Sequence, residues 1–166
     1  MFHETEYSKY DIGDKTLSCG RRADSFKLWL SMKKHGMDGF VRIAEYAMEK
    51  SIYITKRIKE QPDKFEMVNE PMGVNICFWY YPPAFRGDKR SEYTDELKTH
   101  THKLIFERFQ QHGTVLIQHN PLPEYNLPNF LRLVLKGEKS SLEDMDYLLS
   151  EIDRIGSDIT AETFSK

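Results

Sequence analysis

The sequence has 166 residues, of which 39% are hydrophobic and 30% are charged, and its formal net charge is −2. This balance is typical of one soluble globular domain, excludes a disordered chain, and favours neither nucleic acid nor an anionic membrane as a partner. The longest apolar run, Ile76 to Tyr81, is too short to cross a bilayer, and Met1 to Glu6 lacks the features of a signal peptide. Two cysteines make no disulfide framework, so we expect a cytoplasmic protein.

Two helices are predicted near the start of the chain. The first 22 residues are polar without a clear period, and we expect them to form a loop. A helix is predicted from Asp24 to His35, with Gly36 as the residue after its end, and a longer one from Phe40 to Lys59. Apolar residues recur at helical spacing in both segments: Phe26, Trp29, Leu30 and Met32 in the first, and Phe40, Ile43, Ala44, Ala47, Met48, Ile54 and Ile58 in the second.

The rest of the chain alternates between strand and helix patterns. Strands are predicted over Phe65–Val68, Val74–Tyr80, Thr114–Gln118 and Asn129–Leu135, and helices over Tyr93–Gln111 and Ser140–Ile155. A loop is predicted between Phe85 and Arg90, and prolines mark a loop between the last two strands.

The last helix carries the clearest end signals in the sequence. Ser140 and Glu143 fit a capping box at its start, and Gly156 fits the position after its end. The order helix, helix, strand, strand, helix, strand, strand, helix, with short connections between consecutive strands, favours an antiparallel sheet covered by helices. We therefore expect an α+β domain.

The histidines do not form a metal-binding pattern. His100 and His102 are two residues apart on a predicted helix and would point in different directions, whereas a helical zinc pair needs a spacing of three or four. His112 and His119 have no cysteine or carboxylate cluster at ligand spacing. We expect no metal site.

Cys19 precedes a pair of arginines, which admits two interpretations. Arg21 and Arg22 could lower the pKa of the thiol and make it reactive, but a small buried residue in a tight loop is the simpler interpretation. The arginines themselves could bind an anion, although pairing with Asp14 or Asp24 is favoured by spacing.

Arg132 is the unusual residue of an otherwise apolar strand. Strict alternation places Phe130, Arg132 and Val134 on one face. An arginine on a core-like face is costly unless it is paired, so the position indicates an exposed face or a buried salt bridge, and spacing alone favours these. The functional alternative is a carboxylate anchor, because guanidinium binds carboxylates through two parallel hydrogen bonds.

Several ordered stretches resemble the C-terminal part of the group II pyridoxal-phosphate (PLP)-dependent amino-acid decarboxylases, such as glutamate decarboxylase and cysteine sulfinate decarboxylase. The family patterns are Tyr-Asp-Thr-Gly-Asp-Lys followed by Cys-Gly-Arg, Asn-Val-Cys-Phe-Trp-Tyr-x-Pro-Pro, and Asn-Phe-Phe-Arg. The similar stretches here are Tyr10–Arg22 continuing into Asp24–Leu30, Asn75–Pro83, Asn129–Arg132, and Asp144–Gly156, which resembles the closing helix of the family.

The resemblance implies a fold-type I PLP enzyme that works as a homodimer on an amino-acid substrate. Residues 1–38 would form the end of the large PLP-binding domain, with its last loop and helix. Residues 39–166 would form the small C-terminal α+β domain, an antiparallel sheet covered by helices, which agrees with the fold class expected from the patterns.

The resemblance also implies roles for two residues. Arg132 matches the arginine that holds the α-carboxylate of the substrate. Tyr7 is the nearest candidate for a loop tyrosine that returns a proton to the substrate after CO₂ leaves. An ungapped comparison from Gly13 places Glu6, rather than Tyr7, at the family tyrosine.

The PLP-binding lysine of the family lies in an Asn-x-His-Lys-like motif, and no such motif occurs in this sequence. We therefore expect no cofactor-binding residue in this chain and no decarboxylation by the chain alone. The motifs are most similar to the acidic-substrate branch, so glutamate, aspartate or cysteine sulfinate is the expected substrate of the complete enzyme. The alternative is a genuine short, non-catalytic product that acts as an interaction module, possibly with a full-length decarboxylase subunit.

Overall fold

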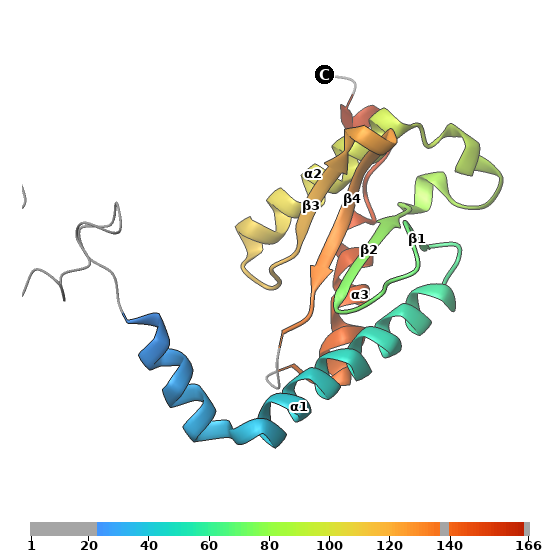
Figure 1. The fold of residues 1–166 in the computed structure, drawn as a ribbon. Coiled ribbons are helices and arrows are strands. Elements are labelled where there is room, and N and C mark those ends of the chain that lie inside the picture. The colour runs from blue at the N-terminus through green and yellow to red at the C-terminus, as the bar shows by residue number, and fades with distance from the viewer. Residues whose placement is uncertain (1–22, 137–139, 165–166) are drawn as a thin grey trace, which may run out of the picture. The chain divides into compact units, whose positions relative to one another are not determined.

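The computed structural model describes residues 23–136 and 140–164 (Figure 1). The chain divides into two compact units between Phe40 and Val41. The division lies two residues from the predicted boundary, and the assignment of residues 1–38 to a large PLP-binding domain stays a prediction. Helices and strands follow one another in the predicted order.

Helix α1 (Asp24–Lys59) contains the two predicted helices, separated by a break at Gly36. Gly36 has φ 63° and ψ −178°, a backbone conformation that glycine adopts without the steric cost of a Cβ atom. The break is therefore where the sequence predicted it. The second stretch becomes helical directly after this residue, at residue 37, and the predicted start at Phe40 was too late.

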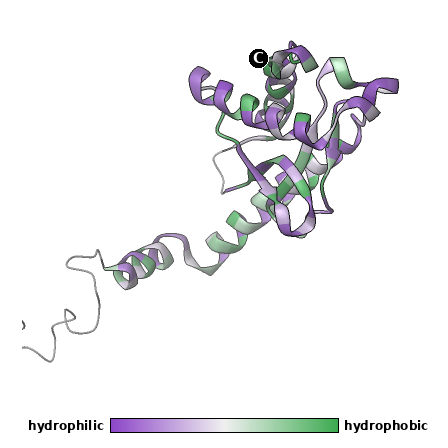
Figure 2. Ribbon diagram, turned by 90° about the horizontal axis from the view of Figure 1, so that it is seen from above, coloured by the Kyte–Doolittle hydropathy of each residue, from purple (hydrophilic) through white to green (hydrophobic). Residues whose placement is uncertain are grey.

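The helical part of the first unit exposes its apolar stripe. Phe26 and Trp29 are more than half exposed, and their rings stack with a centroid separation of 5.9 Å. Hydrophobic and hydrophilic residues alternate along this segment (Figure 2). The pattern correctly predicted a helix, whereas burial of the stripe is not seen in the described part of the chain.

The second unit is built around a four-stranded antiparallel sheet. Its strands are β1 (Phe65–Met67), β2 (Asn75–Tyr80), β3 (Gln118–Leu122) and β4 (Leu127–Val134). They lie in the order β1-β2-β4-β3, so the central strands are β2 and β4. With helices packed on it, this sheet confirms the predicted α+β class.

The third strand lies later in the chain than predicted. The pattern indicated Thr114–Gln118, but β3 begins at Gln118 and includes Pro121. Proline was taken as a loop signal because it cannot donate a hydrogen bond to a neighbouring strand. Since β3 is an edge strand that pairs only with β4 among the described strands, Pro121 is accommodated near a register shift between Asn120 and Leu122.

Helix α2 (Asp95–His112) begins and ends with the side chains that such termini need. The hydroxyl of Thr94 accepts a hydrogen bond from the backbone N–H of Leu97, and Gly113 ends the helix in a left-handed conformation. The predicted loop before it, from Phe85 to Arg90, includes residues of two short 3₁₀ helices, η3 (Pro83–Phe85) and η4 (Gly87–Glu92).

Helix α3 (Leu142–Gly156) is capped one residue later than predicted. Ser141 and Asp144 form the capping box, with the Ser141 N–H donating to Asp144 Oδ2 at 2.7 Å. The prediction of Ser140 with Glu143 was therefore wrong by one position. Gly156 is the last helical residue and not the residue after the end. A Cβ atom at this position would overlap the Tyr80 ring, so the close packing there requires glycine.

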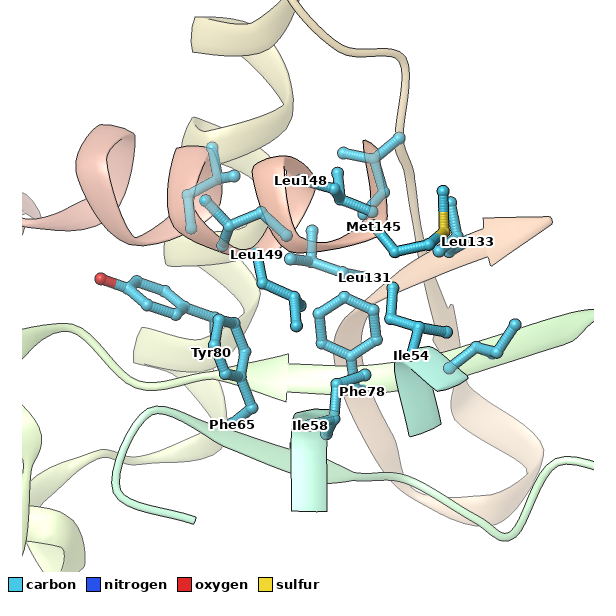
Figure 3. Packing of buried hydrophobic residues seen from close by; sticks show 14 of the residues in the cluster. Ile54, Ile58, Phe65, Phe78, Tyr80, Leu131, Leu133, Met145, Leu148 and Leu149 are labelled. Atoms are coloured by element: carbon cyan, nitrogen blue, oxygen red, sulfur yellow. The ribbon is translucent and has the colours of Figure 1, made fainter. Parts of the chain in front are cut away.

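Helices α2 and α3 and the second half of α1 supply the helical side of the main core. Figure 3 shows Phe78 of β2 between isoleucines of α1 and leucines of β4 and α3. Ile54, Ile58, Phe78 and Leu131 are fully buried. Each such side chain stabilises the fold by about 1.5–3 kcal/mol relative to an exposed one.

A smaller aromatic cluster includes β2 and β4 residues whose side chains alternate with those of the main core. Its buried members are Trp79, Tyr81, Phe85, Tyr93 and Phe130. Phe85 of η3 and Tyr93, which precedes α2, thus pack against the strand residues Trp79 and Phe130. Within the described ranges, we find no helix with the length and apolar character needed to cross a membrane.

Candidate carboxylate-binding site on the sheet

The two faces of β4 differ in what covers them. Leu131 and Leu133 pack in the main core, whereas Phe130 packs in the aromatic cluster. Arg132 and Val134 are only half-buried. The predicted alternation is confirmed, and Arg132 escapes the cost of a core position because its part of the face lies beyond the aromatic cluster.

Arg132 lies at the centre of the sheet between two strands. Its register partners are Cys77 of β2 and Gln118 of β3. A concavity of about 490 Å³ opens beside it, lined by Leu116, Gln118, Arg132, Val134 and Lys136. Two lining residues are cationic, and no carboxylate of the described chain lines the concavity, so its charge favours an anion.

One neighbouring side chain holds the guanidinium group of Arg132. The Nε atom of Arg132 donates a hydrogen bond to the Oδ1 atom of Asn75 at 3.1 Å. Among the residues that the structure describes, no acidic side chain forms an ion pair with Arg132. The predicted alternative of a buried salt bridge is therefore not seen there, and both terminal amino groups remain available to an incoming carboxylate.

Cys77 shares this face but does not have the properties of a nucleophile. The thiol is partly buried, and burial raises its pKa, although the nearby charge of Arg132 acts in the opposite direction. A raised pKa lowers the fraction of thiolate, which is the reactive form. The site is thus suited to binding an anion rather than to attacking a substrate.

The predicted tyrosine and thiol candidates cannot be placed. Tyr7, Cys19, Arg21 and Arg22 lie outside the described residues. The histidines can be placed in part: His100 is exposed, whereas His102 is fully buried. Across residues 23–136 and 140–164, no group of three or more histidine, cysteine or acidic side chains is arranged to hold a metal ion.

Sequence reasoning missed the two amides beside Arg132. Asn75 begins β2 and Gln118 begins β3, and each was read only as part of a strand or motif. A polar residue at the start of an apolar strand is too common to indicate a functional role. The strand register would have revealed that Asn75 contacts Arg132, 57 positions later, but a register cannot be obtained from one sequence.

Most of the chain is similar to known decarboxylases. Residues 1–81 match the family model described as the pyridoxal-dependent decarboxylase conserved domain. Glutamate decarboxylase of Drosophila melanogaster is 37% identical over 150 residues, which cover 90% of this chain and 29% of that protein. Human cysteine sulfinic acid decarboxylase is 36% identical over 149 residues, which cover 90% of this chain and 30% of that protein. This chain therefore spans about 30% of the length of these relatives.

Solved structures of similar proteins share the fold of this chain. Mouse CSAD, in its apo form, aligns with a TM-score of 0.80 at 34% identity, over 95% of this chain and 33% of that one. Oryza sativa TDC with PLP and tryptamine aligns with a TM-score of 0.69 at 18% identity, over 88% of this chain and 29% of that one, which shows the fold alone. Although this chain spans only about a third of these proteins, the matches identify it as a member of the group II PLP-dependent decarboxylases, with the small α+β domain of fold-type I.

Proposed function

We propose that this chain is the C-terminal part of a PLP-dependent decarboxylase that removes the α-carboxylate of an acidic amino acid. In this proposal Arg132 binds that carboxylate. The observation that carries it is the position of Arg132, which is half-buried beside a concavity that no described acidic residue lines. Its terminal amino groups form no ion pair with any described residue. The identity to glutamate and cysteine sulfinic acid decarboxylases supports the same assignment.

The chemistry of the guanidinium group suits this role. Its planar arrangement of N–H donors matches the two oxygens of a carboxylate, and it stays charged at every physiological pH. A hydrogen bond to a charged partner is stronger than one between neutral groups. Arg132 would therefore fix the orientation of the carboxylate that leaves as CO₂.

The described residues do not fit a resident PLP group. PLP enzymes hold the cofactor through a lysine at its aldehyde and a partner for its pyridine nitrogen, often an aspartate. The concavity beside Arg132 offers Lys136 but no carboxylate, and Lys64, in another hollow of the surface, is paired with Asp153 at 2.6 Å. We therefore propose that PLP, which supplies the electron sink for decarboxylation, is held by residues beyond those described, and that the isolated chain is inactive.

The substrates that we propose are glutamate, aspartate and cysteine sulfinate. They follow from the names of the similar proteins, which include an acidic amino acid decarboxylase, GADL1, of Xenopus tropicalis at 37% identity. We also propose that the complete enzyme is a cytoplasmic homodimer and that Tyr7 is its proton donor. The dimer and the role of Tyr7 rest on the family resemblance. The cytoplasmic location rests on the low cysteine count.

A second candidate function is that of a non-catalytic interaction module. Within the second unit, Val41, Met48 and Ile52 of α1 are seven and four residues apart and thus share one side of the helix. Their exposed fractions are 51%, 41% and 67%. An apolar stripe of this kind is suited to a protein partner.

The size of the native polypeptide separates the two candidates. We would probe an extract of the source cells, under denaturing conditions, with an antibody raised against residues Asp144–Ile155, using the free peptide as a competitor. A band more than three times the 19.6 kDa of this chain supports the decarboxylase, because the chain spans 29% of a decarboxylase relative. A lone band at 19.6 kDa supports the module and contradicts the first proposal.

A further inference from the structure

We infer that Asn75 is a positioning residue, whose side-chain oxygen holds Arg132 Nε so that the terminal amino groups of the guanidinium face the concavity. This inference rests on the proposed function, in which Arg132 binds the substrate carboxylate. It adds a second residue to that site, one that acts through Arg132 rather than on the substrate.

The register of β2 and β4 brings the two residues together. Asn75 pairs with Val134, and Cys77 pairs with Arg132, in an antiparallel ladder. Asn75 is therefore a diagonal neighbour of Arg132, and both side chains project from the same face of the sheet. Long side chains reach one another across such a diagonal, and the backbone of both strands is held by the ladder.

The hydrogen bond selects one edge of the guanidinium group. A carboxylate can bind an arginine along the edge that includes Nε or along the edge formed by the two terminal amino groups. Because Asn75 occupies Nε, it leaves the terminal edge for the ligand. The Arg132 side chain would also lose less conformational entropy on binding, because the hydrogen bond to Asn75 already restricts its rotamers.

The neutrality of the amide is as important as its position. An aspartate at the same place would also accept the Nε hydrogen bond, but its charge would cancel the attraction of Arg132 for an anion. Asn75 orients the guanidinium and keeps the positive charge of the concavity. An arginine that is oriented, and that no acidic residue of the described ranges neutralises, has the properties that a carboxylate site requires.

The test uses the full 166-residue chain labelled with ¹⁵N-arginine. The NMR signal of Arg132 Nε–H is assigned by its loss in Arg132→Lys, and its chemical shift and exchange with water are then measured before and after addition of sodium glutarate. The variants are Asn75→Ala, which removes the acceptor, and Asn75→Asp, which restores it. Gln118→Ala is the matched control, because Gln118 also lines the concavity and opposes Arg132.

We expect Asn75→Ala to move the Arg132 Nε–H signal to the shift and fast exchange of exposed arginines, and to weaken glutarate binding about fivefold. Asn75→Asp should restore the signal but not the binding, and Gln118→Ala should leave the signal unchanged. An unchanged signal in Asn75→Ala, or in Asn75→Ser if the alanine variant does not fold, overturns the inference. If glutarate does not change the Arg132 Nε–H signal of the unmodified chain, the proposal that Arg132 binds a carboxylate fails. The effect of Asn75→Ala on the same signal without glutarate still tests whether Asn75 positions Arg132.

Discussion

The buried imidazole of His102 accepts a hydrogen bond through Nε2 from the backbone N–H of Tyr80 at 3.0 Å. On its other side, Nδ1 lies 2.6 Å from the carbonyl oxygen of Lys98, to which it donates. Both ring nitrogens are thus satisfied in the neutral form, and the side chain joins α2 to β2. A proton on Nε2 would break the bond to Tyr80 and place a charge in the core.

This arrangement predicts that the fold loses stability in mild acid. Burial lowers the pKa of His102 to about 3, from the usual value of 6.5 for histidine. Below pH 6.5 the unfolded chain takes up a proton at this position and the folded chain does not, so the stability falls as the pH decreases toward 3. Between pH 7 and pH 5 we expect a loss of about 2 kcal/mol in the free energy of unfolding, measured by urea denaturation.

Substitution separates His102 from the other histidines. His102→Gln keeps a hydrogen-bond acceptor without a titratable group, and we expect it to remove most of this pH dependence. The exposed His100 is the matched control, and His100→Gln should keep the dependence. An equal loss of stability between pH 7 and pH 5 in His102→Gln and in the unmodified chain would disprove the assignment.

Gly156→Ala should destabilise the fold through a direct overlap with Tyr80. A Cβ at this position would lie 2.3 Å from Tyr80 Cε1, and the ring is fully buried. The Tyr80 hydroxyl is also bonded to Asp153 Oδ1 at 2.9 Å, which opposes movement of the ring. We expect a loss of about 1–3 kcal/mol by urea denaturation. Gly73→Ala, whose Cβ would meet nothing within 4 Å, should have little effect, and similar losses in both variants would contradict the account.

Ser141→Ala should cost about 1 kcal/mol of stability, because it removes the N-cap of α3. Asp144 N–H donates to the Ser141 hydroxyl at 3.2 Å, and this bond is lost in the variant. Glu143→Ala removes the acidic residue that the sequence pattern wrongly assigned to the capping box. The melting temperature should decrease more in Ser141→Ala than in Glu143→Ala. A larger decrease in Glu143→Ala would contradict the capping box of Ser141 and Asp144.

If the proposed function is correct, Arg132→Gln should impair decarboxylation by the complete enzyme more than it impairs folding. The variant keeps hydrogen-bonding ability but loses the charge and the planar group of donors. We expect kcat/KM for an acidic amino acid to fall on the order of 100-fold, with urea stability changed by less than about 1 kcal/mol. A variant with unimpaired kcat/KM would exclude Arg132 as the carboxylate anchor.

Much of the fold was predictable from the sequence because local signals and tertiary packing agree. Gly36 breaks α1 and Gly113 ends α2, and both have a positive φ angle, which glycine adopts without steric cost. The errors occurred where tertiary context decides. Pro121 lies in a strand because that strand is at an edge, and position 156 needs a glycine because the Tyr80 ring fills the space that a Cβ atom would take.

The candidate site was only half predictable. Arg132 was noticeable because a charge interrupts an apolar strand, and alternation placed it on the correct face. Asn75 was not noticeable, because its role depends on which residue of β4 it faces. The register of β2 and β4, which are separated in the sequence by α2 and β3, is set by packing. The position of Tyr7 remains a prediction based on the resemblance.

The central claim is that this chain belongs to a decarboxylase of acidic amino acids. The most direct measurement is release of labelled CO₂ from carboxyl-labelled glutamate, aspartate and cysteine sulfinate by the native polypeptide, captured from the source cells through an antibody to residues 142–156. The account predicts PLP-dependent release from at least one of the three, and none from the isolated 166-residue chain. Capture of the polypeptide in folded form without release from any of them, with PLP added, would contradict it.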